Sequence, residues 1–255
     1  MSLSIQGDNL AHATRNKITI KNLKTKTERS FIEHKEYIDF ILYTPNFLIS
    51  CAENIKIINE KNENDKKEIT TASYVLCCAL KGNNLVYCDG IGNVFLHDLI
   101  TNNSKLLFCK PYNTTDVYFI SNDKIVFCNI GIGIYNVTTN TLEYFNDEYR
   151  GLGVSQDYAL IATMDSKYNI VILNSQTKQV VKILEKGFHT RPVYAFCFDK
   201  NVLYTGGVDK VIYKWNLVTG KCINKVKTSN IVGSMAKHGN DLYYVDSELN
   251  QVKNF

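Results

Sequence analysis

The chain has 255 residues, of which 45% are hydrophobic and 21% are charged, and its formal net charge at pH 7 is +4. This composition is typical of a soluble globular protein, and the length suits one sizeable hydrophobic core. No apolar run approaches the roughly 18 residues that a membrane-spanning helix needs. Residues 1–8 also lack the basic and apolar regions of a secretory signal. We therefore expect a cytoplasmic protein that does not contact a membrane.

An apolar run recurs along the chain at nearly constant spacing. The run begins at Ile18, Ile55, Val94, Ile132, Ile170 and Ile212. The spacings of 37 to 42 residues fit a four-stranded propeller blade, and residues 241–255 repeat the pattern once more. A second apolar run precedes each of these, and no sustained 3.6-residue period appears. The sequence predicts an all-β, seven-bladed propeller that forms a single domain over residues 1–255, with essentially no helix.

The first unit is the basic part of the chain. Between Arg15 and Lys35 lie seven basic and two acidic residues. Arg15 and Lys17 flank a turn at the rim of the first blade, where Arg can bind a phosphate through two hydrogen bonds and Lys acts as a point charge. The segment either binds the phosphates of a polyanion or is a solvated charged edge that limits aggregation. The candidate contacts are Arg15 and Lys17, with Lys24, Lys26, Arg29 and Lys35 in neighbouring loops.

The second unit contains the most polar stretch of the sequence. Residues 59–68, NEKNENDKKE, are almost all charged or amide side chains. We expect a loop there that extends beyond the sheet.

The sixth unit gives the strongest hairpin signal. In residues 202–217, VLYTGGVDKVIYKWNL, a β-rich run meets a Gly-Gly-x-Asp turn and a second run ends in Trp215. This unit resembles a WD40 repeat. The resemblance implies hydrogen bonds within the blade among His189, Thr205, Asp209 and Trp215, and Asn216 stands where the family has aspartate.

The last unit lacks a fourth run, because the sequence ends at Phe255. In most propellers an N-terminal segment completes the last blade and removes an exposed sheet edge. Residues 2–6 either form the first strand of blade one and leave blade seven three-stranded, or close the ring and shorten blade one. The sequence leaves both arrangements open.

The residues that carry chemistry do not form a recognisable active site. The eight cysteines fall in apolar runs without metal-ligand spacing, which favours reduced, buried thiols. Adjacent Cys77 and Cys78 should point to opposite faces of one strand. His34, His97 and His189 occupy repeat positions, and the Gly-x-Gly triplets lack the third glycine of a dinucleotide site. We expect no enzymatic activity, no metal and no cofactor.

Residues 10–23, LAHATRNKITIKNL, and 28–41, ERSFIEHKEYIDFI, resemble the first blade of the receptor for activated C kinase family, WD40 scaffolds of the small ribosomal subunit. That family has an Arg-Asp-Lys turn that contacts ribosomal RNA phosphates, and here the turn reads Arg15-Asn16-Lys17. The resemblance implies a docking platform on the small (40S) subunit in translation and signalling, with ribosomal RNA, ribosomal proteins and regulatory proteins as partners. The alternative is a WD40 subunit of another assembly, such as a coat or nuclear pore, without RNA contact.

Overall fold

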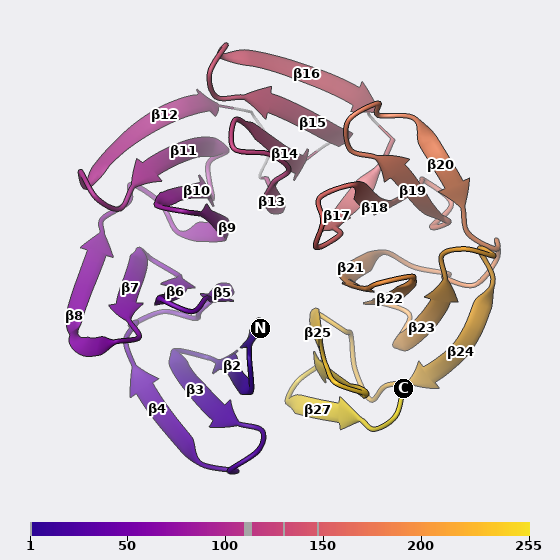
Figure 1. Ribbon diagram of the computed structural model, residues 1–255, viewed down its shortest axis with the longest axis horizontal. Coiled ribbons are helices and arrows are strands. Elements are labelled where there is room, and N and C mark those ends of the chain that lie inside the picture. Colours follow the sequence, from indigo (N-terminus) through magenta and orange to yellow (C-terminus); the bar gives the residue numbers. More distant parts are fainter. Residues whose placement is uncertain (1, 110–113, 130, 147) are drawn as a thin grey trace.

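The computed structural model describes residues 2–109, 114–129, 131–146 and 148–255. These residues form 27 strands, and no helix capable of crossing a bilayer occurs among them. The strands make seven antiparallel sheets that stand radially around a central axis, as Figure 1 shows. The seven-bladed β-propeller predicted from the sequence repeat is confirmed.

Blades one to three are each four-stranded. They comprise β1 (Leu3–Gln6), β2 (Asn9–Thr14), β3 (Lys17–Asn22) and β4 (Glu28–Ile32); β5 (Phe40–Tyr43), β6 (Phe47–Cys51), β7 (Ile55–Asn59) and β8 (Asn62–Ile69); and β9 (Val75–Lys81), β10 (Asn84–Asp89), β11 (Asn93–Asp98) and β12 (Asn103–Cys109).

Blades four to six are four-stranded and blade seven is three-stranded. They comprise β13 (Asp116–Phe119), β14 (Lys124–Asn129), β15 (Gly131–Asn136) and β16 (Thr141–Asn146); β17 (Arg150–Val154), β18 (Leu160–Met164), β19 (Ile170–Asn174) and β20 (Val180–Ile183); β21 (Val193–Asp199), β22 (Val202–Gly207), β23 (Val211–Asn216) and β24 (Cys222–Lys227); and β25 (Ser234–His238), β26 (Asp241–Val245) and β27 (Leu249–Val252).

The second strand is the most buried strand in five of the seven blades, while β15 exceeds β14 in blade four and β18 and β19 are equal in blade five. In β10 five of six residues are buried, and β22 has the same proportion. Each sheet packs against a neighbouring blade on both of its faces, so its middle strands read as nearly continuous apolar runs. Cys77 and Cys78 show this arrangement, because Cys77 packs with Val117 of blade four and Cys78 packs with Ile49 of blade two. The expected opposite orientation of the two thiols is confirmed.

The polar stretch at residues 59–68 is not a projecting loop, and that prediction is wrong. Residues 62–69 form β8, the outer strand of blade two, in which seven of eight residues are exposed. A strand at the outer edge of a ring pairs with only one neighbour, so polar side chains there lose little solvation. Charged side chains on such an edge also discourage pairing with other chains.

Blades one and seven meet without exchanging a strand. β1 pairs only with β2 in blade one, while β27 pairs only with β26. Of the two arrangements that the sequence left open, the structure shows the first, with a three-stranded blade seven. Figure 1 shows the N-terminal end near this seam and the C-terminal end on the other side of blade seven, next to blade six.

Side chains close the seam in place of backbone pairing. The amide of Leu3 donates to Ser234 Oγ at 3.3 Å, linking β1 to β25. Leu10 and Leu23 of blade one pack against Tyr243 of blade seven, and all three are buried. The ring is therefore held shut by packing and by polar side-chain contacts.

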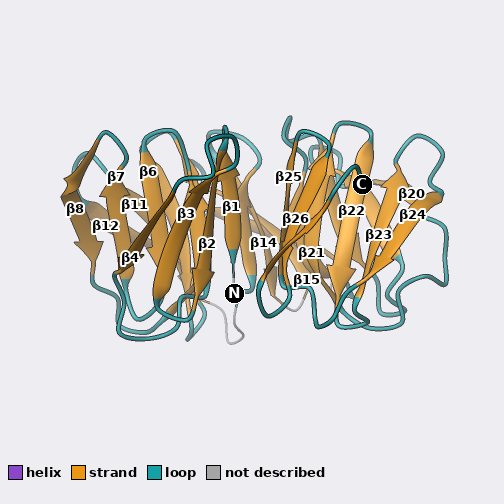
Figure 2. Ribbon diagram, turned by 90° about the horizontal axis from the view of Figure 1, so that it is seen from below, coloured by secondary structure: helices purple, strands orange, loops and turns teal. Residues whose placement is uncertain are grey.

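The connecting turns gather at the two ends of the ring, as Figure 2 shows. We call the end with the β2–β3 turn the Arg15 face, and the opposite end, with the β1–β2 and β3–β4 turns, the Lys24 face. Because successive strands run antiparallel, the loops that join one blade to the next lie at the Arg15 face.

Candidate nucleic-acid interface

The β2–β3 turn is held rigidly by its backbone. Thr14 pairs with Lys17, so Arg15 and Asn16 form a two-residue loop. Arg15 has φ of 56°, in the left-handed region that a residue with a side chain adopts at some cost. Its carbonyl accepts a hydrogen bond from the amide of Ile38 at 2.9 Å. The loop that leads into blade two thereby fixes the turn.

Arg15 and Lys17 present exposed cations on this turn. Within the described parts of the chain, no carboxylate oxygen lies within 4.0 Å of either side chain's charged nitrogens. Two cations without acidic partners on a fixed turn can bind an external anion without first breaking an ion pair.

Lys35 lies on the same face, in the loop from β4 to β5. Its amide donates to Glu53 Oε1 at 3.2 Å, and the amide of Glu36 donates to Oε2 at 3.4 Å. The Lys35 side chain is exposed and has no carboxylate within ion-pair distance among the described residues. Ile38 of the same loop holds Arg15, so the structure brings Arg15, Lys17 and Lys35 onto one face of blades one and two.

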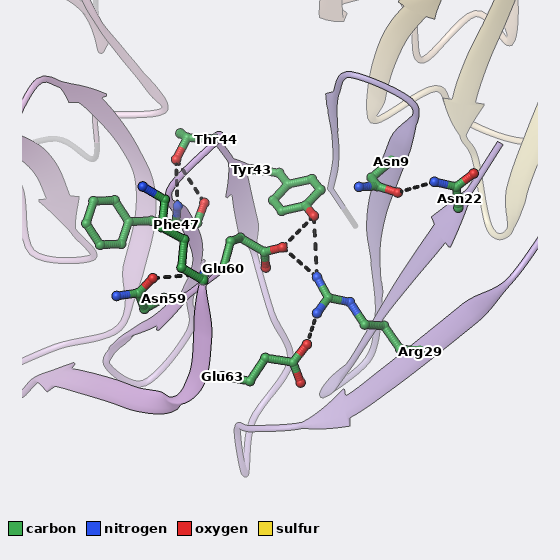
Figure 3. A network of polar contacts seen from close by, with 10 residues as sticks. Asn9, Asn22, Arg29, Tyr43, Thr44, Phe47, Asn59, Glu60 and Glu63 are labelled. Atoms are coloured by element: carbon green, nitrogen blue, oxygen red, sulfur yellow. Dashed lines mark hydrogen bonds and ion pairs between the residues drawn. The ribbon is translucent and has the colours of Figure 1, made fainter. Parts of the chain in front are cut away.

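Arg29 is occupied within the protein, as Figure 3 shows. It lies on β4, where its guanidinium contacts Glu60 Oε2 at 2.5 Å and forms a second ion pair with Glu63. Tyr43 donates to the same Glu60 oxygen at 2.7 Å. Arg29 therefore joins blade one to blade two, and its charge is balanced by the two glutamates.

Lys24 and Lys26 lie on the Lys24 face, at the far end of β3 from Lys17. A strand of six residues spans roughly 20 Å, so they do not add to the field around Arg15 as the sequence led us to expect. Lys24 forms an ion pair with Asp8 at 2.8 Å, and this hydrogen bond lowers the pKa of Asp8. Lys26 donates to the backbone carbonyl of Leu23.

The four repeat positions of blade six form one hydrogen-bonded chain. His189 Nδ1 lies 2.7 Å from Asp209 Oδ2, and its Nε2 lies 2.7 Å from Thr205 Oγ1. Trp215 Nε1 donates to the same hydroxyl at 2.8 Å. All four side chains make contacts within the blade, so this cluster braces the blade's inner strands.

Blade two contains a related set of contacts. His34 is buried, with Nε2 2.8 Å from Ser50 Oγ and Nδ1 3.3 Å from Glu53 Oε2. Burial lowers the pKa of His34. The spacing of 16 residues from histidine to hydroxyl is the same as in blade six. Sequence comparison between units could have found this pair, but the third member is a glutamate that stands one residue earlier than Asp209 does in blade six, which conceals it.

The other histidines do not converge on a reactive group. His97 is buried against Ser104 at 2.8 Å, and burial lowers its pKa. His238 Nε2 lies 3.1 Å from Asp8 at the seam between blades one and seven. Across the described ranges, no group of three or more His, Cys, Asp or Glu side chains is placed to hold a metal ion.

The sequence did not reveal the polar lining of the axial channel. Inner strands of all seven blades enclose a cavity of about 560 Å³, whose lining includes Asp39, Asp116 and Arg150. Asp116 is half-buried, and burial raises its pKa to about 7 despite a hydrogen bond from Thr115 at 3.1 Å. The sequence signal for this lining is a charged residue at or just before the start of an inner strand, as with Asp39, Asp116 and Arg150.

Comparison with known proteins supports the fold alone. No protein-family model matches the chain, and no curated protein matches it by sequence. One similar solved structure is the computationally designed Ika8 protein, with 14% sequence identity and a TM-score of 0.74 over 99% of this chain and 95% of that one. Another is a chain of the mitotic checkpoint complex, with 15% identity and a TM-score of 0.81 over 96% of this chain and 83% of that one. Together with the seven radial sheets, these similarities show that the chain has a seven-bladed β-propeller fold.

Proposed function

We propose that this chain is a non-catalytic scaffold that docks on the small ribosomal subunit in the cytoplasm through ribosomal RNA phosphates. Arg15 and Lys17 make the leading contacts, and Lys35 adds a third cation on the same face. Ribosomal proteins pack beside this contact, and the free rims of the ring receive regulatory proteins. Lys24, Lys26 and Arg29 take no direct part, because their positions or ion pairs direct them elsewhere.

The observation that carries this proposal is a pair of exposed cations, Arg15 and Lys17, without acidic partners among the described residues. They lie on a turn whose backbone is hydrogen-bonded to the amide of Ile38. A turn fixed by the Ile38 amide loses little conformational entropy when a phosphate binds. Each neutralised phosphate releases counterions, so binding should weaken steeply with salt. Resemblance of residues 10–23 to the first blade of the ribosomal scaffolds supports RNA as the polyanion.

The test is co-sedimentation with ribosomes in sucrose gradients. The Arg15→Asp, Lys17→Glu double variant should leave the ribosomal fraction, with at least a tenfold loss of affinity and a nearly unchanged melting temperature. The matched control is Lys200→Glu with Lys221→Glu, two exposed lysines on the Lys24 face with the same change in charge. Full co-sedimentation of the Arg15, Lys17 variant would reject the proposal.

A second candidate function is a subunit of another multiprotein assembly without RNA contact. The three-stranded blade seven favours it, because an unpaired strand edge can receive a partner. Sedimentation of the untagged protein with a particle that contains no ribosomal RNA would support this candidate over the first.

A further inference from the structure

We propose that the outer edge of β27 accepts an extended, acidic segment of a partner protein as the fourth strand of blade seven. The inference begins with the other six blades, each of which ends in a fourth strand of four to eight residues. β27 has only β26 as a neighbour. Every second residue of such a strand directs an unpaired N–H and C=O away from the sheet.

The described chain does not fill this position itself. After β27 it turns toward blade six, where the carbonyl of Phe255 accepts a hydrogen bond from Tyr204 Oη at 3.0 Å. The amide of Phe255 donates to the carbonyl of Asn240, in the β25–β26 turn of blade seven, at 3.1 Å. The Phe255 ring is buried beside Tyr204. β1 is committed to blade one. Among the described residues, no strand therefore pairs with the outer edge of β27.

The flanks of the edge already provide apolar support for another strand. Leu249 packs against the cluster of Leu10, Leu23 and Tyr243 at the seam with blade one. Val252 packs with the cluster on the blade-six side. Side chains of an added strand would alternate between these two flanks. The fourth strands of the other blades all run antiparallel to the third, so the incoming segment should do the same.

The charge around the edge indicates an acidic partner. A groove of about 460 Å³ runs between blade one and β27, and its lining includes three lysines, His238 and Asp241. Asp8 lies 3.1 Å from His238 Nε2. Lys24 pairs with Asp8, but Lys26 and Lys253 have no carboxylate within 4.0 Å among the described residues. Glutamate or aspartate on the flank that faces blade one would meet these ammonium groups.

This site is independent of the RNA contact. It lies toward the Lys24 face, whereas Arg15 and Lys17 lie at the opposite end of blade one. Loss of either binding activity should therefore leave the other intact.

The test uses a fluorescent hexapeptide, Val-Glu-Val-Glu-Val-Glu, in anisotropy titrations with the full chain. We expect binding, and protection from hydrogen exchange confined to residues 249–252. N-methylation of the three valines, which removes edge hydrogen-bond donors from the peptide, should weaken binding at least tenfold. Replacement of the peptide's glutamates by lysine should have an effect at least as large.

Variants of the protein test whether the lysines beside the edge, rather than the overall charge of the protein, attract the acidic peptide. The double variant Lys26→Glu, Lys253→Glu should bind the glutamate peptide at least tenfold more weakly. The control variant Lys200→Glu, Lys221→Glu should bind it with unchanged affinity. The proposal is overturned if the peptide does not bind, or if N-methylation has no effect. It is also overturned if residues 249–252 are already protected in a dimer of this chain, because a second copy would then occupy the edge.

Discussion

The amide of Ile38 donates a hydrogen bond to the carbonyl of Arg15 at 2.9 Å, and this bond ties the β2–β3 turn of blade one to the loop entering blade two. The bond involves only backbone atoms, so it remains when the side chain of residue 15 changes. A substitution can therefore remove the guanidinium group without removing the hydrogen bond that holds the turn.

Arg15→Gly should leave the fold intact while it removes one of the leading cations. Glycine adopts the observed φ of 56° without the steric cost that arginine incurs, so the free energy of unfolding should stay equal or rise by up to about 1 kcal/mol. Arg15→Val, β-branched at the same φ, should lower it. Urea unfolding of both variants measures the effect, and a large loss of stability in Arg15→Gly would show that the side chain supports the turn.

Thr205 should matter more to stability than its counterpart Ser50. Thr205 Oγ1 contacts both His189 and Trp215, so Thr205→Val leaves two buried groups unpaired and should lower the free energy of unfolding by about 3 kcal/mol. Ser50→Ala affects only the His34 contact and should cost about 1 kcal/mol.

Denaturant unfolding compares these variants, with the exposed Thr219→Val as a control expected to change the free energy of unfolding by less than about 0.5 kcal/mol. Equal losses for Thr205→Val and Ser50→Ala would show that the second contact of Thr205 contributes little.

The ionised carboxylate of Asp116 should destabilise the ring at neutral and higher pH. Its folded pKa of about 7 lies above the unfolded value, so stability is greatest while the carboxyl is protonated and falls as pH rises from about 4 to about 7. Asp116→Asn should match the wild type at pH 4 and exceed it at pH 8 by about 2 kcal/mol, since solvent in the channel screens the half-buried carboxylate. Chemical unfolding at both pH values measures the difference. A variant that is less stable at pH 8 would contradict this account.

Protonation of His12, His34 and His97 should destabilise the ring in acid, because the first is half-buried and the other two are buried. Burial lowers the pKa of His12, His34 and His97, so the unfolded chain binds protons first. Stability from these groups is present above the unfolded pKa of about 6.5 and is lost as pH falls below it. In the Asp116→Asn background, which removes the opposing trend, melting temperature should fall between pH 7 and pH 5. An unchanged melting temperature over that interval would count against burial as the cause.

Individual elements show why parts of the fold could be predicted and others could not. The strands of blade six follow from local turn chemistry and alternation, because Gly206, Gly207 and Asp209 specify a tight turn. The first half of β8 was mistaken for a loop because seven of the eight residues of this outer strand are exposed and carry no apolar pattern. The contacts of Arg29 with Glu60 and Glu63 escaped prediction because they join separate blades.

The amino-acid sequence by itself determined the number of blades, the order of their strands and the concentration of cations near the N-terminal end. These properties depend on local periodicity and composition, which each unit of about 40 residues carries within itself. The three-dimensional arrangement was needed to see that Lys24 lies away from Arg15, that two glutamates pair with Arg29, and that β27 has no fourth strand beside it among the described residues. Each of these outcomes depends on which ends of the strands meet and on contacts across blades, and a one-dimensional pattern does not specify either.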